Sequence, residues 1–553
     1  MGGEKIPEIY YSGPAALISA LYDELKIGQT IDEMVSWDQD QCHMSPGKRT
    51  KALMINIFGR KRPLYRIDEF YENMDTENLF GKGICLEDLT DYNLARALDK
   101  LFERGPHAVF STVCLRAICQ EQISLKYLYN DTTSISVHGD YEYEEATDPD
   151  FLITHGHSKD RRPDLKQFLY GLSVTEDKVP VAADVNSGNL DDKSWNFDYI
   201  EKLAQSLTPD MLSEIIYVAD SALVTEPNLA KLKSNNLKFI SRLPGNFDLE
   251  KELKAKAWQK DEFRELGTFS NRKDAASYCY QEFSGFIRED KYRFLVVHSS
   301  KLDGRKARSL NTQLSKRRKA LEKEVKSKVK ETFACLPDAE AALNQFITKQ
   351  GDEHFKIMGQ VISEEKRKPG RPGKNSPIST VYRLQLEVSL DQEAVKRTKK
   401  RLSCFILITN LDQSYSPFEV LKQYKAQSRV ETSFKFLKDP LFVGPVFLKK
   451  PSRIQALAYV FLMALLMFGL LERRVREAMK HETEPLLIPG KVKTFKPTGK
   501  KILESLEGIM VMTTDDPNRR AFGSRFKVPR VIELAGFSPD IYLDVKERHE
   551  YFT

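Results

Sequence analysis

Amphipathic helical segments dominate the first 122 residues of the chain. Apolar side chains recur there at intervals of three and four positions, a spacing that predicts helices. The predicted helices are Pro14–Leu25, Lys48–Phe58, Asp91–Arg104 and His107–Gln122. A basic turn, Gly59-Arg60-Lys61-Arg62, follows the second of them. We therefore expect a helical N-terminal domain over residues 1–122. Short helices with a basic turn fit a DNA-binding domain and a plain helical domain equally well.

The pattern changes to strands near residue 124. The stretch LKYLYNDTTSISV, residues 125–137, is rich in β-branched and aromatic residues, which favours a strand. Further predicted strands cover 168–174, 180–185, 215–220 and 238–243, and predicted helices cover 194–207 and 227–232. Three strands in succession, followed by alternating helices and strands, predict an α/β fold with a mixed sheet flanked by helices.

This regular pattern is interrupted once. From about residue 247 to residue 402 it breaks into short strands and a charged helix. It returns with an apolar strand at 404–410, helices at 417–426 and 429–438, and a long apolar helix. We therefore predict one domain, formed by 123–246 and 403–482, with an insertion domain at 247–402. A C-terminal tail, 483–553, follows with one predicted helix at 500–507.

Composition places the chain among soluble, folded proteins. Its 553 residues are 41% hydrophobic and 30% charged, and this length predicts about two to four domains. Seven scattered cysteines without a CxxC pair indicate reduced thiols and no zinc site. The N-terminus lacks the pattern of a signal peptide, so we expect a cytoplasmic protein.

One apolar stretch could be mistaken for a membrane span. IQALAYVFLMALLMFGLL, residues 454–471, just reaches the length that a span requires. It contains Gln455, the charged Glu472-Arg473-Arg474 follows at once, and the sequence has no second such stretch. A helix that is apolar all round also suits the centre of a large soluble domain. We therefore predict a core helix and no membrane association.

Positive charge is concentrated in one segment. The whole chain has a net charge of only +6, whereas Lys301 to Lys330 contains twelve Lys or Arg and three acids, a local charge of +9. Such a run is either a solvated helix face or a surface that binds phosphates. If it binds phosphates, Lys316, Arg317 and Arg318 are candidate DNA contacts.

Three carboxylates are unremarkable singly, since an Asp at a strand end is often a helix cap or turn former, but they are informative as a set. Asp131 lies in the middle of a predicted strand, where acids are depleted, and Asp220 ends the apolar strand IIYVAD. Glu431 lies on the later helix 429–438. Two carboxylates on strands and a third on a helix can bind Mg²⁺, a cation that prefers oxygen ligands. Two such ions can activate a water or a 3′-hydroxyl and stabilise the leaving oxygen of a phosphodiester.

The helix that contains Glu431 also has a simpler interpretation. Val430, Phe434 and Leu437 form an apolar stripe. The adjacent stripe consists of polar side chains: Tyr424, Gln427, Glu431, Lys435 and Lys438. Taken alone, this pattern predicts a surface helix with an ion pair between Glu431 and Lys435. If Asp131 and Asp220 complete a metal site, the lysines contact the phosphate backbone instead.

The three acids lie in motifs that resemble those of a known family. Asp131 begins the run Asp131-Thr132-Thr133-Ser134, and Asp220 lies in Val218-Ala219-Asp220-Ser221-Ala222-Leu223. Tyr424, Glu431 and Lys438 match the signature Y-x2-R-x3-E-x6-K. With these motifs the sequence resembles the DDE transposases of bacterial insertion sequences, in the IS-four superfamily and its IS-sixteen-thirty-four branch. The resemblance covers most of the chain and is strongest over about 125–245 and 403–475.

One position departs from the family signature. Gln427 stands where the wider superfamily has an arginine that grips the terminal phosphate. Lys425 or Arg429 could take over that contact. We therefore count Tyr424, Lys425, Gln427, Arg429, Lys435 and Lys438 among the expected DNA-binding residues.

The resemblance implies a fold, a mechanism and partners. It implies a ribonuclease-H-like domain in which Asp131, Asp220 and Glu431 are catalytic and hold two Mg²⁺ ions, for which Mn²⁺ can substitute. Its DNA partners would be transposon ends and target DNA, held by a homodimer. Hydrolysis would expose a 3′-OH at each transposon end, and that hydroxyl would attack target DNA; relatives can pass through a hairpin intermediate. The alternatives are a ribonuclease-H-like nuclease without strand transfer and a non-catalytic DNA-binding protein descended from a transposase.

Three further motifs each have two interpretations. KRKPGRPGK, residues 366–374, resembles an AT-hook in which Arg371 enters the minor groove, or is a flexible basic loop. HGHSKDRRPDLKQ, residues 155–167, has two histidines but no third soft ligand nearby, so a DNA-contacting loop is favoured over a metal site. Trp258 is either a packed side chain or, as the resemblance implies, an aromatic that stacks on a flipped base.

Overall fold

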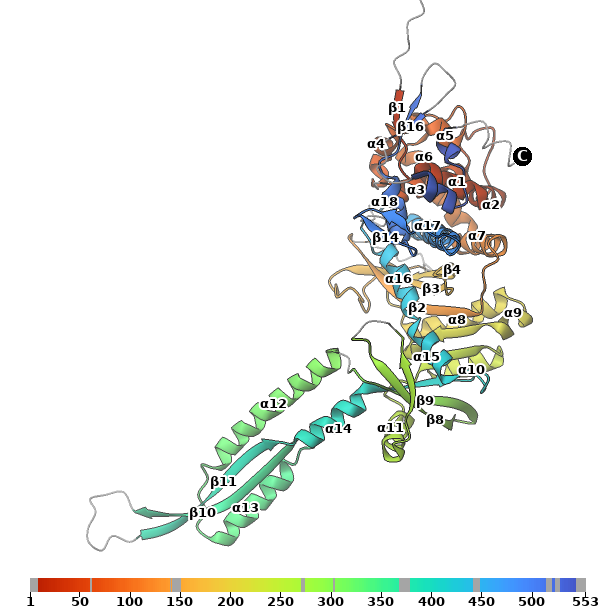
Figure 1. The fold of residues 1–553 in the computed structure, drawn as a ribbon. Coiled ribbons are helices and arrows are strands. Elements are labelled where there is room, and N and C mark those ends of the chain that lie inside the picture. The colour runs from red at the N-terminus through yellow and green to blue at the C-terminus, as the bar shows by residue number, and fades with distance from the viewer. Residues whose placement is uncertain are drawn as a thin grey trace, which may run out of the picture. The chain divides into compact units, whose positions relative to one another are not determined.

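The computed structural model describes residues 8–59, 62–139, 141, 151–269, 274–301, 304–367, 378–440, 448–513, 520–522 and 528–543. The chain divides into two compact units. The first unit comprises residues 1–241 and 419–553, and the second comprises residues 242–418. Figure 1 labels many of the elements of both units.

The central strands of the first unit form a mixed sheet. They are β2 (Tyr127–Val137), β3 (Lys166–Val174), β4 (Pro180–Ser187), β5 (Ile216–Ala219) and β6 (Lys238–Arg242), in the order β4-β3-β2-β5-β6. The pairs β2–β3 and β3–β4 are antiparallel, whereas β2–β5 and β5–β6 are parallel. All five strands lie where the sequence pattern predicts them, and the sheet is mixed as expected.

Helices connect the parallel strands of this sheet. α8 (Asp192–Ser206) and α9 (Pro209–Glu214) precede β5, and α10 (Glu226–Ser234) lies between β5 and β6. Asp191 caps α8 by accepting hydrogen bonds from two backbone N–H groups, and Thr225 caps α10 in the same way with one. These caps satisfy N–H groups that have no partner within the helix. The connections bring the ends of β2 and β5 to the same region of the sheet.

The N-terminal segment is helical, as expected. Its principal helices are α1 (Ala15–Glu24), α2 (Ile27–Met34), α3 (Pro46–Phe58), α6 (Asp91–Arg104) and α7 (Pro106–Gln120), with the shorter α4 (Ile67–Tyr71) and α5 (Thr76–Phe80) between them. The predicted helices correspond to α1, α3, α6 and α7, whereas α2 escaped prediction because it has only eight residues. The segment is not a unit by itself, since it belongs to the same compact unit as the central sheet.

The long apolar helix α17 (Pro451–Ala478) joins these parts. It packs against α3, α6 and α7 of the N-terminal segment and against β4 of the sheet. Its most apolar 18-residue window has a mean hydropathy of 2.3, enough for a membrane span, yet 83% of that window is buried within the protein. At its end, Arg474 forms ion pairs with Glu24 and Glu121. In this structure the helix is therefore a core element.

The last part of the chain is more structured than the predicted tail with one helix. It contains α18 (Gly499–Leu506), α19 (Val528–Leu534) and the hairpin of β13 (Leu486–Ile488) and β14 (Val492–Thr494). β15 (Met510–Thr513) pairs with β16 (Arg520–Phe522) and with β1 (Glu8–Tyr11). The buried Tyr542 donates a hydrogen bond to the carbonyl of Gly13. The predicted helix at 500–507 corresponds to α18. The other elements, of three to seven residues, were missed because they span too few positions to show a period.

The second unit has its own strands and helices. One part consists of β7 (Arg264–Thr268), β8 (Ser277–Ile287), β9 (Asp290–Ser299) and β12 (Cys404–Thr409), in the order β12-β9-β8-β7, with α11 (Asp248–Lys260) and α14 (Gln392–Ser403) packed against β9 and β12. The other part is the hairpin of β10 (Phe355–Arg367) and β11 (Ile378–Leu390), with α12 (Gly304–Lys328) and α13 (Leu336–Lys349) along it (Figure 1).

Two expectations for this region need correction. The strands β8, β10 and β11 have 11 to 13 residues and are not short. Their apolar positions are interspersed with charged ones because much of their surface is exposed, and this hid them in the sequence. The predicted boundary at residue 403 also differs from the structure, because β12 pairs with β9 and lies in the second unit.

Candidate active site

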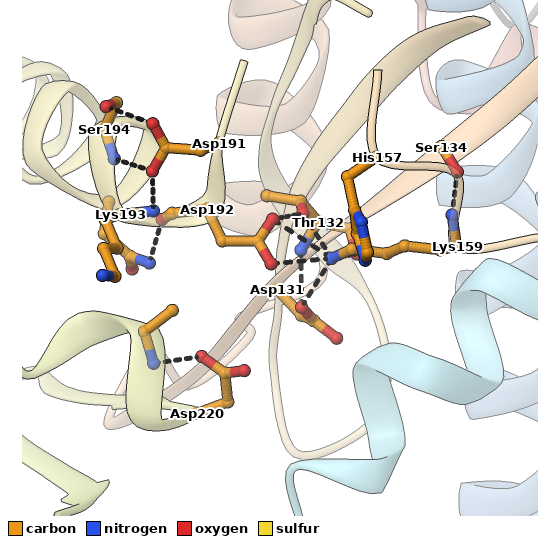
Figure 2. Close-up of polar contacts among 12 residues, drawn as sticks. Asp131, Thr132, Ser134, His157, Lys159, Asp191, Asp192, Lys193, Ser194 and Asp220 are labelled. Atoms are coloured by element: carbon orange, nitrogen blue, oxygen red, sulfur yellow. Dashed lines mark hydrogen bonds and ion pairs between the residues drawn. The ribbon is translucent and has the colours of Figure 1, made fainter. Parts of the chain in front are cut away.

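Two of the three singled-out carboxylates lie on adjacent parallel strands. Asn130 of β2 pairs with Ala219 of β5, so Asp131 and Asp220 are the next residues on the two strands. Adjacent strands lie about 4.8 Å apart. Residues separated by 89 positions in the sequence are therefore brought together at one place in the sheet (Figure 2). Both side chains are partly buried.

Local hydrogen bonds occupy one oxygen of each carboxylate. Asp131 Oδ1 accepts a hydrogen bond of 2.7 Å from the N–H of Thr132, and Asp220 Oδ1 accepts one of 2.9 Å from the N–H of Ala222. The carbonyl of Asp220 also accepts a hydrogen bond of 2.6 Å from Ser241 Oγ on β6. Among the described residues, the second oxygen of each carboxylate has no hydrogen bond. The two groups are thus fixed in place with one oxygen available to a ligand.

The environment of this pair disfavours negative charge. Burial raises the pKa of Asp131 to about 6; the charge of Asp220 contributes to this rise, and Lys159 opposes it. Burial also raises the pKa of Asp220, and the charge of Asp192 adds to that rise. Two adjacent, partly buried carboxylates repel each other unless a cation or a proton neutralises them. This arrangement is common at functional sites and has no evident structural purpose here.

Two charged residues that the sequence analysis did not select complete the cluster. Lys159 Nζ lies 3.7 Å from Asp131 Oδ1 and 3.1 Å from Asp192, the first residue of α8. Lys159 Nζ also donates hydrogen bonds to the carbonyl and the hydroxyl of Thr132 (Figure 2). Lys159 lies in the HGHSKDRRPDLKQ segment, for which a DNA-contacting loop was favoured without singling out this lysine. Asp192 follows the capping residue Asp191, so the sequence indicates only that it lies in the first turn of a helix.

Glu431 has a different environment. It lies on α16 (Ser428–Leu437), which packs against β2 and β3 through the buried Val430, Phe434 and Leu437. The predicted apolar stripe is therefore confirmed. Glu431 itself is exposed, and among the described residues its side chain has neither a hydrogen bond nor an ion pair. The ion pair with Lys435 that a plain surface helix would have is not formed.

The structure does not bring all three acids into one metal-binding group. Among the described residues, no three His, Cys, Asp or Glu side chains are close enough to hold a common ion. Asp131 and Asp220 are brought together, whereas Glu431 lies apart from them on α16. The two histidines, His155 and His157, are exposed and belong to no such group either.

The expected DNA-binding residues around Glu431 are only partly available. Lys435 is exposed, but Lys438 Nζ lies 2.6 Å from Asp160 in an ion pair. Arg429 donates hydrogen bonds of 3.0 Å to Tyr129 Oη and to Glu176 Oε1. Gln427 immediately precedes α16 without capping it through its side chain. Tyr424 and Lys425 lie at the end of α15 (Pro417–Lys425), where Tyr424 is half-buried and Lys425 is exposed.

The remaining candidates lie in the second unit, where three of them are engaged in ion pairs or aromatic packing. Arg317 forms an ion pair of 3.1 Å with Asp352, and Arg318 forms one with Glu322 one turn along α12, while Lys316 is exposed. Trp258 packs with ring centroids 4.9 Å from Phe263 and 5.2 Å from His298, as the packed interpretation expects. Arg371 lies outside the described residues.

Comparison with known protein families gives two matches. A family model described as a transposase DDE domain matches residues 130–467, more than half of the chain. A second model, described as a domain of unknown function (DUF4277), matches residues 8–115. A search of curated proteins found no match. The first match begins one residue before Asp131 and contains Asp220, Glu431 and the whole segment between them.

Proposed function

The chain belongs to the family of proteins with a transposase DDE domain, and from this premise we propose that it cuts the ends of a mobile DNA element and joins their 3′-hydroxyls to target DNA. Membership makes it a transposase, an enzyme class that transfers phosphoryl groups of nucleic acids. The observation that carries the finer proposal is the adjacency of Asp131 and Asp220 on β2 and β5, each with one unbonded oxygen.

We propose a ribonuclease-H-like catalytic domain. Its support is the strand order β4-β3-β2-β5-β6, with three antiparallel strands followed by two parallel ones. The resemblance implies that the first catalytic acid lies in a strand and that the second ends a later strand, and Asp131 and Asp220 are consistent with this expectation. The motifs of the chain fit the IS-four superfamily and its IS-sixteen-thirty-four branch.

The donor set of the cluster fits magnesium. Its donors are carboxylate oxygens, which Mg²⁺ prefers. A cation would stabilise the ionised forms, which burial and, to a lesser degree, neighbouring carboxylates disfavour and which therefore have a raised pKa in Asp131 and Asp220. We propose that Asp131, Asp220 and Glu431 hold two Mg²⁺ ions, or Mn²⁺ in their place. When bound, such ions favour deprotonation of the attacking water or 3′-hydroxyl and stabilise the leaving oxygen. Glu431 has no side-chain partner within the part of the chain that the structure describes, and we propose that it joins the pair when DNA is bound.

The residues of the chain position the DNA. The exposed Lys435 suits a phosphate contact directly. Lys438 and Arg429 can bind phosphate after exchanging Asp160 and Glu176 for it, and Tyr424, Lys425 and Gln427 lie in the same stretch of sequence. Lys425 and Arg429 are the two candidates for the phosphate contact of the missing signature arginine. To make this contact, Arg429 would have to break its ion pair with Glu176.

The proposed oligomeric state follows from the proposed reaction, in which two transposon ends are joined to one target DNA. We propose a homodimer that holds both transposon ends in the bacterial cytoplasm. A hairpin intermediate with Trp258 stacked on a flipped base would require this side chain to leave Phe263 and His298. Lys316, Arg317, Arg318 and Arg371 are proposed as further DNA contacts.

The test uses duplex DNA that carries the terminal sequences of the element. The full-length protein should nick these ends in Mg²⁺ and join the 3′-OH products to a target plasmid, and EDTA should stop both steps. Asp131→Asn should abolish both. Asp191→Asn is the matched control, because asparagine caps a helix as well as aspartate does and Asp191 bonds only within the start of α8. Cleavage without joining would favour a nuclease, and binding without cleavage would favour a non-catalytic DNA-binding protein.

A further inference from the structure

Lys159 occupies the position of a cation within the carboxylate cluster. Its Nζ donates hydrogen bonds of 2.8 Å to the carbonyl of Thr132, 2.7 Å to Thr132 Oγ1 and 3.1 Å to Asp192 Oδ1. Asp131 Oδ1 lies 3.7 Å away. An ammonium group surrounded by oxygens from a carbonyl, a hydroxyl and two carboxylates resembles a metal ion in the types of its ligands.

The position of this ammonium is fixed by the fold. The N–H of Lys159 donates a hydrogen bond of 2.9 Å to Ser134 Oγ on β2. The backbone and the side chain of Lys159 are therefore both attached to β2, on Ser134 and Thr132. Thr132 Oγ1 also donates a hydrogen bond to Asp192, so the start of α8 belongs to the same network. The Lys159 side chain is only 29% exposed, which is low for a lysine that serves solubility alone.

We propose that Lys159 is a tethered cation that sets how strongly the site binds divalent ions and how well it accepts a phosphodiester. This inference rests on the proposed function, since it assumes that the same cluster binds Mg²⁺. Asp131, Asp192, Asp220 and Glu431 together would balance two dications. Once two dications balance these four carboxylates, the positive charge of the Lys159 ammonium remains, and a phosphate of the DNA can neutralise it. Lys159 is a positioning residue that acts through Asp131 and Asp192.

Lys159 and Asp192 have opposite charges, so removing one or the other charge should have opposite effects on metal binding. Removing the ammonium with Lys159→Met leaves more negative charge around Asp131, so divalent ions should bind about tenfold tighter if the screening is nearly that of water. Removing a carboxylate with Asp192→Asn while the ammonium stays should weaken their binding by a similar factor. A purely structural role of the network would make both variants bind metal more weakly, because both would disorder the cluster.

The experiment measures Mn²⁺ binding to the full-length protein without DNA, by the electron paramagnetic resonance of free Mn²⁺. The proteins are wild type, Lys159→Met, Lys159→Arg, Asp192→Asn and Lys193→Met. Lys193→Met removes the same charge from an exposed side chain next to Asp192, and Lys159→Arg keeps the charge at the site. Both should bind Mn²⁺ like wild type. Lys159→Met should also bind transposon-end DNA several-fold more weakly in Ca²⁺.

The outcomes separate this inference from the proposed function. Tighter Mn²⁺ binding by Lys159→Met together with weaker binding by Asp192→Asn supports the tethered cation. Equal or weaker binding by a folded Lys159→Met protein overturns it, while the metal site itself stands if wild type binds Mn²⁺. Absence of Mn²⁺ binding in all five proteins would remove the proposed metal site and this inference with it. Circular dichroism in EDTA checks that each variant is folded.

Discussion

The carboxylates at the strand ends and the carboxylate on α16 are held in opposite ways. Asp131 and Asp220 are partly buried, each is fixed by a backbone N–H group, and burial raises the pKa of both. Glu431 is exposed on a helix whose other face is firmly packed. The strand pair is thus rigid and electrostatically unfavourable, whereas Glu431 is unconstrained beyond its own helix.

This difference suggests that the two kinds of carboxylate have different functions in the site. Burying like charges side by side costs stability, and in the first unit it is offset by the large apolar core around α17. Such a pair suits a site that must be in place before its ligand arrives. A carboxylate on a helix surface adds little strain and can adjust when DNA is bound. The two kinds of acid should therefore respond differently to the same Asp→Asn or Glu→Gln change.

The largest effect should come from Glu431→Gln. The change is nearly isosteric and leaves Val430, Phe434 and Leu437 in place, so the protein should fold normally and still bind transposon ends. Loss of a negative metal ligand should abolish Mg²⁺-dependent cleavage. The measurement is a gel shift beside a cleavage assay. Glu103→Gln, the same change at another exposed glutamate on α6, is the control. Wild-type cleavage by Glu431→Gln would make Glu431 an ordinary surface residue.

Asp131→Asn should abolish cleavage too, but unlike Glu431→Gln it should stabilise the metal-free protein. At pH 8 the folded wild type contains an ionised, partly buried Asp131, and its removal should raise the free energy of unfolding by about 1–3 kcal/mol. The unfolded state has the lower pKa, so wild type loses this stability as the pH rises from about 4 to about 6. The advantage of Asp131→Asn should therefore be small at pH 4 and full above pH 7.

Urea unfolding in EDTA at several pH values tests this prediction, and Asp191→Ala is a control of opposite sign. Hydrogen bonds from Ser194 lower the pKa of Asp191, so its ionised form stabilises the fold. Its removal should cost about 1 kcal/mol at pH 7 and less at low pH. If Asp131→Asn destabilised the protein at pH 8, the ionised Asp131 would not be unfavourable in the fold, and the proposed contrast with Glu431 would be wrong.

The sequence predicted the parts of this contrast that depend on local periodicity. The five strands of the first unit and the helix α16 appear in the apolar pattern. Asp131 was conspicuous because acids are rare inside strands, whereas Asp220, at a strand end, became informative only together with Asp131 and Glu431. The adjacency of the two strands could be inferred only through the resemblance to a family, because pairing of β2 with β5 is a property of the whole sheet.

Other features could not be read from periodicity. Lys159 and Asp192 reach the cluster through a loop and a helix start, and neither has a repeating pattern that reveals its neighbours. β12 is apolar enough to be recognised as a strand, but its pairing with β9 is a long-range contact. The ion pairs of Arg429 and Lys438 are likewise invisible in sequence, since their partners Glu176 and Asp160 lie more than 250 positions away.

A smaller effect is expected from Lys438, the basic residue at the end of the helix that contains Glu431. Lys438→Ala should weaken binding of transposon ends about three- to tenfold and leave residual cleavage at high protein concentration, because it removes a phosphate contact and no metal ligand. Asp160→Asn is the informative partner variant. It frees Lys438 from its ion pair and should strengthen binding slightly. Weaker binding by both variants in gel shifts would mean that the pair positions the loop around Lys159 instead.

The smallest effect concerns the basic face of α12 in the second unit. Lys316 and Lys319 are exposed, whereas Arg317 is bound to Asp352, so the double change Lys316→Ala and Lys319→Ala tests DNA contact with little effect on folding. If both lysines bind phosphates, the slope of log affinity against log salt should become shallower by about 1.8, since each contact contributes about 0.9. Affinity at low salt should fall by a larger factor than at high salt. Arg317→Ala is the contrasting variant: it should lower the melting temperature through loss of Asp352 and change the slope less. An unchanged slope in the double variant would show that Lys316 and Lys319 make no phosphate contacts and would identify this face as a solvated helix surface.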